Sequence, residues 1–131
     1  LCLEGALKLK EISYIHCEGY GAGELKHGTI SLIENGTVVV AVATDDTLYG
    51  KMVSNIKEVH ARGAYVIAVV KEGTKGMEDV ADEVIYIPVS SRYLMPSLTV
   101  IPLQLLAYHA TIERDLDVDK PRNLAKSVTV E

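Results

Sequence analysis

Two runs of mostly apolar residues, rich in β-branched side chains, constrain the fold of this chain most strongly. The runs cover residues 37–42 and 64–70, and neither alternates with polar positions. Continuous runs of this kind are typical of parallel strands that are covered on both faces. A helix over residues 47–62, preceded by Asp45 and Asp46 and ended by Gly63, separates them. With a third strand over residues 84–87, the pattern predicts a βαβ layout and a three-layer αβα sandwich with a parallel sheet.

Further helices are expected over residues 1–16, 29–33 and 97–113, and Pro102 either kinks the last helix or marks its start. Residues 17–28 form a glycine-rich connector. From residue 116 the chain is irregular and polar, yet it carries apolar anchors at Leu124, Val128 and Val130. Free tails are usually bland in composition. We therefore expect one α/β domain over residues 1–115 and a tail over residues 116–131 that docks on it.

The composition limits the class of function. Hydrophobic residues make up 48% and charged residues 24% of the 131 residues, which is the profile of a globular protein. The formal net charge of -5 and the lack of a basic cluster argue against nucleic-acid partners. No apolar run has the length of a membrane span, and Cys2 and Cys17 lack the spacing of metal ligands. We expect a cytoplasmic protein without a bound metal, whose partner is a small molecule or another protein.

Lys126, in the tail, is the first candidate for chemistry. A lysine on a docked tail can be held out of water, and desolvation disfavours the charged form of its amine. A neutral amine attacks carbonyl groups to give a Schiff base. The alternative is an ordinary solvated lysine, because lysines are rarely buried.

Lys8 and Glu11 are spaced three residues apart, so they share a face of the first predicted helix. That face also carries apolar residues and Gly5, and a carboxylate in such surroundings can act as a general base, with Lys8 tuning it. The alternative is a helical ion pair with no catalytic role. His27 is a further candidate, because histidine is the residue type best suited to proton transfer under physiological conditions and His27 is predicted to lie in a loop, where functional side chains are common.

Several segments of the chain together match the pattern of one family. The chain reads Gly-Glu-Leu-Lys-His-Gly at 23–28 and Pro-Arg-Asn-Leu-Ala-Lys-Ser-Val-Thr-Val-Glu at 121–131. The other matching segments are residues 3–12, 101–108 and 117–119. In these segments the chain resembles the glutamine–fructose-6-phosphate aminotransferases. The resemblance implies a sugar isomerase (SIS) fold that occurs twice in the isomerase half of the family, with this chain forming most of the second copy, incomplete at its N-terminus, and the terminal tail.

The resemblance also implies a reaction and its residues. The family makes glucosamine 6-phosphate, the first amino sugar of hexosamine biosynthesis, from fructose 6-phosphate and ammonia released from glutamine. By position, Glu11 is similar to the acid/base that moves a proton between the first two sugar carbons, and Lys8 is its neighbour in the pocket. Lys126 matches the Schiff-base lysine, Ala125 contacts the sugar, and His27 assists ring opening from the partner subunit of a homodimer. No cofactor is implied.

Some features depart from the family pattern or leave alternatives open. Thr29 stands where the family motif usually has proline, which affects the segment that carries His27. The chain opens at Leu1 in a helical pattern without a capping residue, so we expect that the family's glutaminase domain and first SIS copy precede it, and that this chain alone is inactive. The alternatives are a non-catalytic regulator that binds sugar phosphate and a fructosamine-6-phosphate deglycase.

Overall fold

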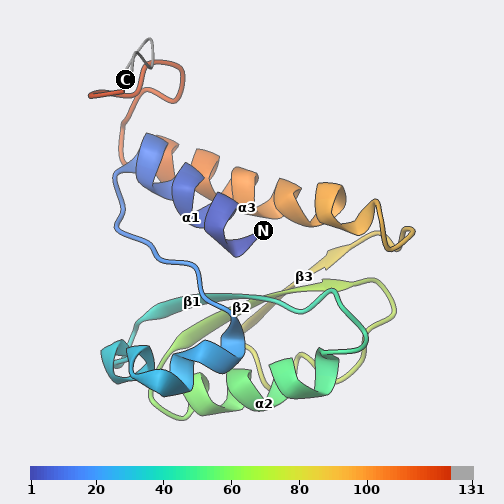
Figure 1. Ribbon diagram of the computed structural model, residues 1–131. Helices are drawn as coiled ribbons and strands as arrows, with labels where there is room; N and C mark the ends of the chain where they lie inside the picture. Colours follow the sequence, from blue (N-terminus) through green and yellow to red (C-terminus); the bar gives the residue numbers. More distant parts are fainter. Residues whose placement is uncertain (125–131) are drawn as a thin grey trace, which may run out of the picture. The chain divides into compact units, whose positions relative to one another are not determined.

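The computed structural model of the protein describes residues 1–124 (Figure 1). Ala125 and Lys126 lie outside the described residues, so their predicted roles stay predictions. The chain divides into two compact units. Among the described residues, one contains Leu1–Gly19 together with residues 103–124, and the other is Tyr20–Pro102.

The second unit is built on a three-stranded parallel sheet in the order β1-β2-β3. Its strands are β1 (Val38–Val42), β2 (Tyr65–Lys71) and β3 (Glu83–Ile87), and β2 pairs with both neighbours. Two register pairs are Val38 with Tyr65 and Ile67 with Glu83. All three predicted strands are therefore confirmed, each within a residue or so of its expected bounds.

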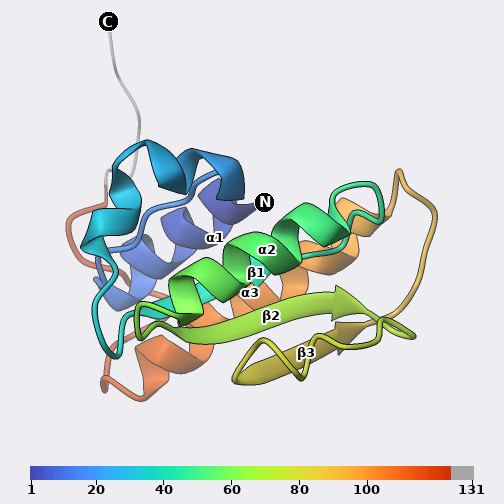
Figure 2. The ribbon, with the colours of Figure 1, turned by 90° about the horizontal axis from the view of Figure 1, so that it is seen from below.

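Both faces of this sheet are covered, as the apolar runs predict. Helix α2 (Tyr49–His60) lies along one face (Figures 1 and 2), where its buried residues belong to one core cluster with Val66, Ala68 and Val70 of β2. On the opposite face Val69 packs with Met95 from the beginning of helix α3 (Met95–Ile112). Side chains of a strand alternate between its faces, so the alternation along β2 confirms the three-layer α/β arrangement.

The helix boundaries differ from the predicted ones for local reasons. Helix α2 begins two residues later than expected, because an Asp45 carboxylate oxygen accepts hydrogen bonds from the Thr47 backbone N–H (2.9 Å) and hydroxyl (2.6 Å), which makes a turn instead of a cap. Helix α3 begins earlier than expected, with the Met95 N–H already bonded to the Ser91 carbonyl (3.0 Å). Pro102 therefore lies inside α3 and does not mark its start.

The expectation of one continuous helix over residues 1–16 is wrong in its second half. An α-helix, α1, covers Cys2–Lys8, and a π-helical turn, η1, covers Leu9–Ser13. Tyr14 then adopts a left-handed backbone conformation (φ 58°), which ends the helix. Within this first unit α1 contacts α3 closely: a Cβ atom added to Gly5 would lie 3.0 Å from Leu103 Cδ1. The glycine therefore serves helix packing.

Candidate functional site

Glu11 lies in the π-helical turn η1, and Lys8 is the last residue of α1. Their predicted pairing is present: Lys8 Nζ donates a hydrogen bond to Glu11 Oε2 over 2.7 Å. Lys8 Nζ is also 3.9 Å from Glu4 Oε1. Both members of the close pair are partly buried, with 35% and 28% of their side-chain surfaces exposed.

The hydrogen bond to Glu11 is the main reason why the pKa of Lys8 is raised, and it outweighs the opposing effect of desolvation. Lys8 therefore stays protonated at neutral pH and places a positive charge against the Glu11 carboxylate. An ammonium group in this position orients the carboxylate and neutralises charge that builds up beside it, which suits a group that passes a proton between adjacent atoms.

A side-chain hydrogen bond within the π-helical turn helps to hold it. Ser13 is completely buried, and its hydroxyl donates a 2.6 Å hydrogen bond to the Leu9 carbonyl. Turns of this kind occur at the C-terminal ends of helices, and this one carries Glu11. The sequence indicated the Lys8–Glu11 pair through its spacing, but the π-turn that presents Glu11 was missed, because no residue preference marks such a turn.

His27 is exposed at the end of a 3₁₀ helix, η2 (Ala22–His27), and not in an irregular loop as predicted. Two residues next to His27 hold η2 against the rest of the second unit. Leu25 packs against the main core cluster, and Lys26 forms a 2.6 Å ion pair with Glu58 of α2. These long-range contacts order a segment whose glycines indicated irregular structure. His27 belongs to a different compact unit from Glu11.

Thr29, which stands at the family's proline position, begins another short 3₁₀ helix, η3 (Thr29–Leu32). Its hydroxyl lies 3.5 Å from the Leu25 carbonyl, at the limit of a hydrogen bond. Between the two short helices Gly28 has φ 139°, a conformation that side chains rarely adopt. The glycine that follows His27 is thus required by the backbone.

The described part of the tail returns to the helix that carries Glu11. The Asp117 carboxylate accepts hydrogen bonds from the N–H groups of Asp119 (2.9 Å) and Lys120 (3.1 Å), which makes a turn. Shortly after it, the backbone N–H of Arg122 donates to the Tyr14 hydroxyl over 2.7 Å. The Arg122 guanidinium carbon also lies 4.2 Å from the centre of the Tyr14 ring.

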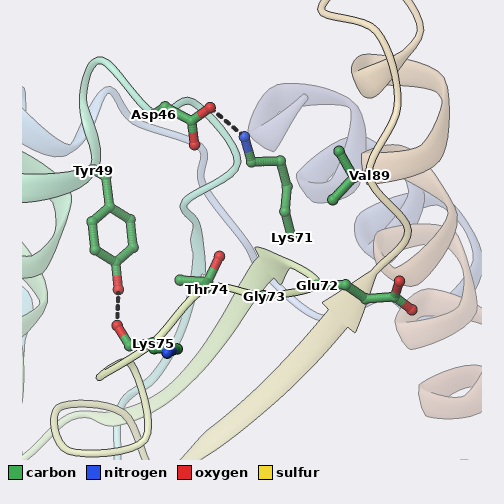
Figure 3. A pocket seen from close by; sticks show the side chains of 8 residues that line it. All are labelled: Asp46, Tyr49, Lys71, Glu72, Gly73, Thr74, Lys75 and Val89. Carbon is green, nitrogen blue, oxygen red and sulfur yellow. Dashed lines mark hydrogen bonds and ion pairs between the residues drawn. The ribbon is translucent and has the colours of Figure 1, made fainter.

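A separate polar pocket, which the sequence analysis did not anticipate, lies at the carboxyl ends of the strands (Figure 3). This open pocket has a volume of about 370 Å³. Lys71 Nζ pairs with Asp46 Oδ2 over 2.5 Å, and the Tyr49 hydroxyl donates to the Lys75 carbonyl over 3.1 Å. The carboxyl edge is where open parallel sheets bind ligands, but the pocket carries charges of both signs. The residues that line it are Asp46, Tyr49, Lys71, Glu72, Gly73, Thr74, Lys75 and Val89.

Other kinds of site find little support in the part of the chain that the structure describes. Within residues 1–124 no three His, Cys, Asp or Glu side chains gather to hold a metal ion. Burial raises the pKa of the Cys17 thiol, so this cysteine is a poor nucleophile at neutral pH. None of the helices in the same range is long and apolar enough to cross a membrane.

Comparisons with known proteins agree with the fold and with the sequence resemblance. A family model described as the SIS domain matches residues 1–114. The glutamine–fructose-6-phosphate aminotransferase [isomerizing] of Caldanaerobacter subterraneus subsp. tengcongensis is 63% identical over all 131 residues, and the protein of that name from Clostridium acetobutylicum is 65% identical. The chain spans 22% of the length of each of these relatives.

Solved structures show the same relationship. The C-terminal domain of glucosamine-fructose-6-phosphate aminotransferase from Francisella tularensis superposes with a TM-score of 0.83 at 45% identity, over 90% of this chain and 33% of that chain. A glucosamine-6-phosphate deaminase from Thermotoga maritima gives 0.74 at 31% identity, over 96% of this chain and 35% of that chain. These matches confirm the resemblance that the sequence segments indicated.

Proposed function

Because the chain belongs to the SIS domain family, we propose that it is part of the isomerase half of a glutamine–fructose-6-phosphate aminotransferase. The enzyme would make glucosamine 6-phosphate from fructose 6-phosphate and glutamine-derived ammonia. The observation that carries this proposal is the identity of 63% to 65% with relatives of that name along the entire chain. The glutaminase domain and the first SIS copy would come from the rest of the protein, so this chain alone would be inactive.

The proposed chemistry uses two groups of this chain in sequence. The Lys126 amine attacks the C2 carbonyl of open-chain fructose 6-phosphate, and a water molecule leaves as the imine forms. Ammonia then replaces the lysine at C2, which frees Lys126. Glu11 takes a proton from C1 and returns it to C2, so that C1 becomes the aldehyde and C2 carries the amine. The chemistry requires neither a metal nor a redox cofactor.

Lys8 supports the proton transfer in this scheme. Its ammonium, 2.7 Å from Glu11 Oε2, keeps the carboxylate oriented while Glu11 changes protonation state. Ala125, next to Lys126, would contact the sugar.

His27 would assist ring opening before the imine forms. Its exposed position at the end of η2 fits a side chain that serves the site of a partner subunit in a homodimer. The packing of Leu25 on the core and the Lys26–Glu58 ion pair would fix the backbone of η2 that carries the imidazole. The location that suits these roles is the cytoplasm, in keeping with the free thiols of Cys2 and Cys17.

Borohydride trapping in the full-length enzyme tests the proposal. Reduction of the enzyme with fructose 6-phosphate should attach the sugar covalently to Lys126, and Lys126→Arg should give no adduct, because guanidinium does not form the imine. Glu11→Gln should still form the adduct but should not exchange the C1 proton with solvent. A regulator that binds sugar phosphate without catalysis would give no adduct in any variant, and a deglycase would consume fructosamine 6-phosphate without needing glutamine. Either result overturns the proposal.

A further inference from the structure

We propose that the contact between Tyr14 and Arg122 positions the C-terminal tail, so that Lys126 reaches a sugar held beside Glu11. Tyr14 and Arg122 would thus be positioning residues for imine formation, and neither would touch the reacting atoms. The inference rests on the proposed function, because it takes Lys126 as the amine that forms the imine.

Two chemically different interactions make up this contact. The Tyr14 hydroxyl accepts a hydrogen bond from the Arg122 backbone N–H (2.7 Å), and the guanidinium carbon of Arg122 lies 4.2 Å from the Tyr14 ring centre. The first interaction needs the hydroxyl of residue 14 but no particular side chain at residue 122. The second needs the aromatic ring and the cation. Substitutions can therefore remove the two interactions one at a time.

The same tyrosine ends the turn that presents Glu11. Tyr14 immediately follows the π-helical turn Leu9–Ser13, and its backbone has φ 58°. A bulky residue in this left-handed region is uncommon and indicates a local constraint, which is a reason to suspect function. Because one residue both closes the Glu11 turn and holds Arg122, the tail is tied to the part of the helix that carries the proposed base.

The chain on either side of Arg122 is restricted as well. The turn made by Asp117 precedes it, Pro121 has its φ angle fixed by the ring, and Asn123 has φ 62°. Lys126 follows Arg122 after four residues, a length of chain that spans at most about 14 Å. A chain held at Arg122 by Tyr14 would therefore keep the proposed nucleophile within that length of Arg122, which lowers the entropy cost of bringing it to a sugar beside Glu11.

Loss of the contact between Tyr14 and Arg122 is expected to lower the rate of imine formation by only a modest factor. Arg122 is exposed and Tyr14 is partly exposed, so loss of the hydrogen bond should reduce the ratio of docked to released tail about fivefold. Loss of the exposed cation–π contact should reduce it about threefold. Since imine formation on Lys126 would require the docked tail, each loss should appear in the rate of imine formation.

The test measures the rate of borohydride-trapped adduct formation in the full-length enzyme at saturating fructose 6-phosphate. Tyr14→Phe removes only the hydrogen bond, Arg122→Ala only the cation–π contact, and Tyr14→Ala both. We expect the rate to fall by about fivefold, threefold and fifteenfold respectively, with Arg122→Lys closer to the unmodified enzyme than Arg122→Ala. KM and Tm should change little. Matched controls are Tyr93→Phe and Arg114→Ala, which make the same chemical changes at exposed positions.

Each outcome decides one question. If the unmodified enzyme forms no adduct on Lys126, the proposed function fails first. If it forms the adduct and the three variants trap sugar at the unmodified rate, the proposed function stands and the positioning role is refuted. If the rate falls only together with Tm, or equally in the control variants, the contact is structural and the positioning role is again refuted.

Discussion

Replacing Ser13 by alanine tests the position of Glu11 separately from the stability of the helix that carries it. The serine is completely buried, and its hydroxyl bonds to the Leu9 carbonyl over 2.6 Å. The substitution forfeits about 0.5–1.5 kcal/mol for the hydrogen bond and regains up to about 0.5 kcal/mol from the better helix propensity of alanine. The expected net loss is therefore about 0–1.5 kcal/mol, which should lower Tm only slightly.

The effect on the reaction should be much larger. Without the serine hydroxyl the π-turn Leu9–Ser13 is free to relax toward α-helical geometry, in which successive residues are about 100° apart. Glu11 would then leave its position in the turn. Since a displacement of about 1 Å can cost a hundredfold in rate, we expect kcat to fall by about 10- to 100-fold.

The assay is kcat and Tm of the full-length enzyme, with Thr111→Ala as the matched control. Thr111 is also completely buried and makes the same kind of bond, from its hydroxyl to the Ala107 carbonyl over 2.6 Å, but within the regular helix α3. Thr111→Ala should lower Tm at least as much as Ser13→Ala and leave kcat nearly unchanged. Normal kcat in Ser13→Ala, or equal loss of kcat in both variants, would refute this reasoning.

Two further predictions concern stability. Ile56→Ala removes a side chain that is 2% exposed in the core between α2 and β2. It should lower the free energy of unfolding by about 2–5 kcal/mol, seen as a large drop in the Tm of the unit that contains the sheet. A small change would mean that this core is loosely packed. The raised pKa of Lys8 means that the Lys8–Glu11 pair stabilises the fold below the ordinary lysine pKa of 10.5 and loses this effect as the pH rises through the raised value. The advantage of the unmodified enzyme over Lys8→Met in denaturant unfolding should therefore disappear at strongly alkaline pH, and an advantage independent of pH would contradict it.

The features that the sequence predicted well are those that depend on local pattern. The apolar runs that became β1 and β2 were visible because strands covered on both faces leave no position for polar residues. The Lys8–Glu11 pair was visible because three-residue spacing brings side chains together in any helix. The predicted role of Lys126 depends on residues that the structure does not describe, so it stays a prediction.

The features that were missed depend on tertiary contacts. The helix η2 is ordered by the ion pair of Lys26 with Glu58, thirty-two residues away. The pocket at the sheet edge is lined by side chains from separate segments, so no single segment of the sequence predicts it. The π-turn forms where Ser13 is buried and Tyr14 turns the chain, and neither residue type has a preference that marks such a turn.

Among the three described strands, β2 alone has a hydrogen-bonded neighbour along each edge, and it also packs on each face. Any displacement of β2 would break hydrogen bonds to a neighbouring strand or open a void in the packing on one of its faces. We therefore expect β2 to move least among the strands of its unit. The backbone at His27 is held in place indirectly. The Lys26–Glu58 ion pair attaches η2 to α2, and α2 packs on β2. A residue at the surface can in this way take the position of its backbone from contacts that lead back to the core.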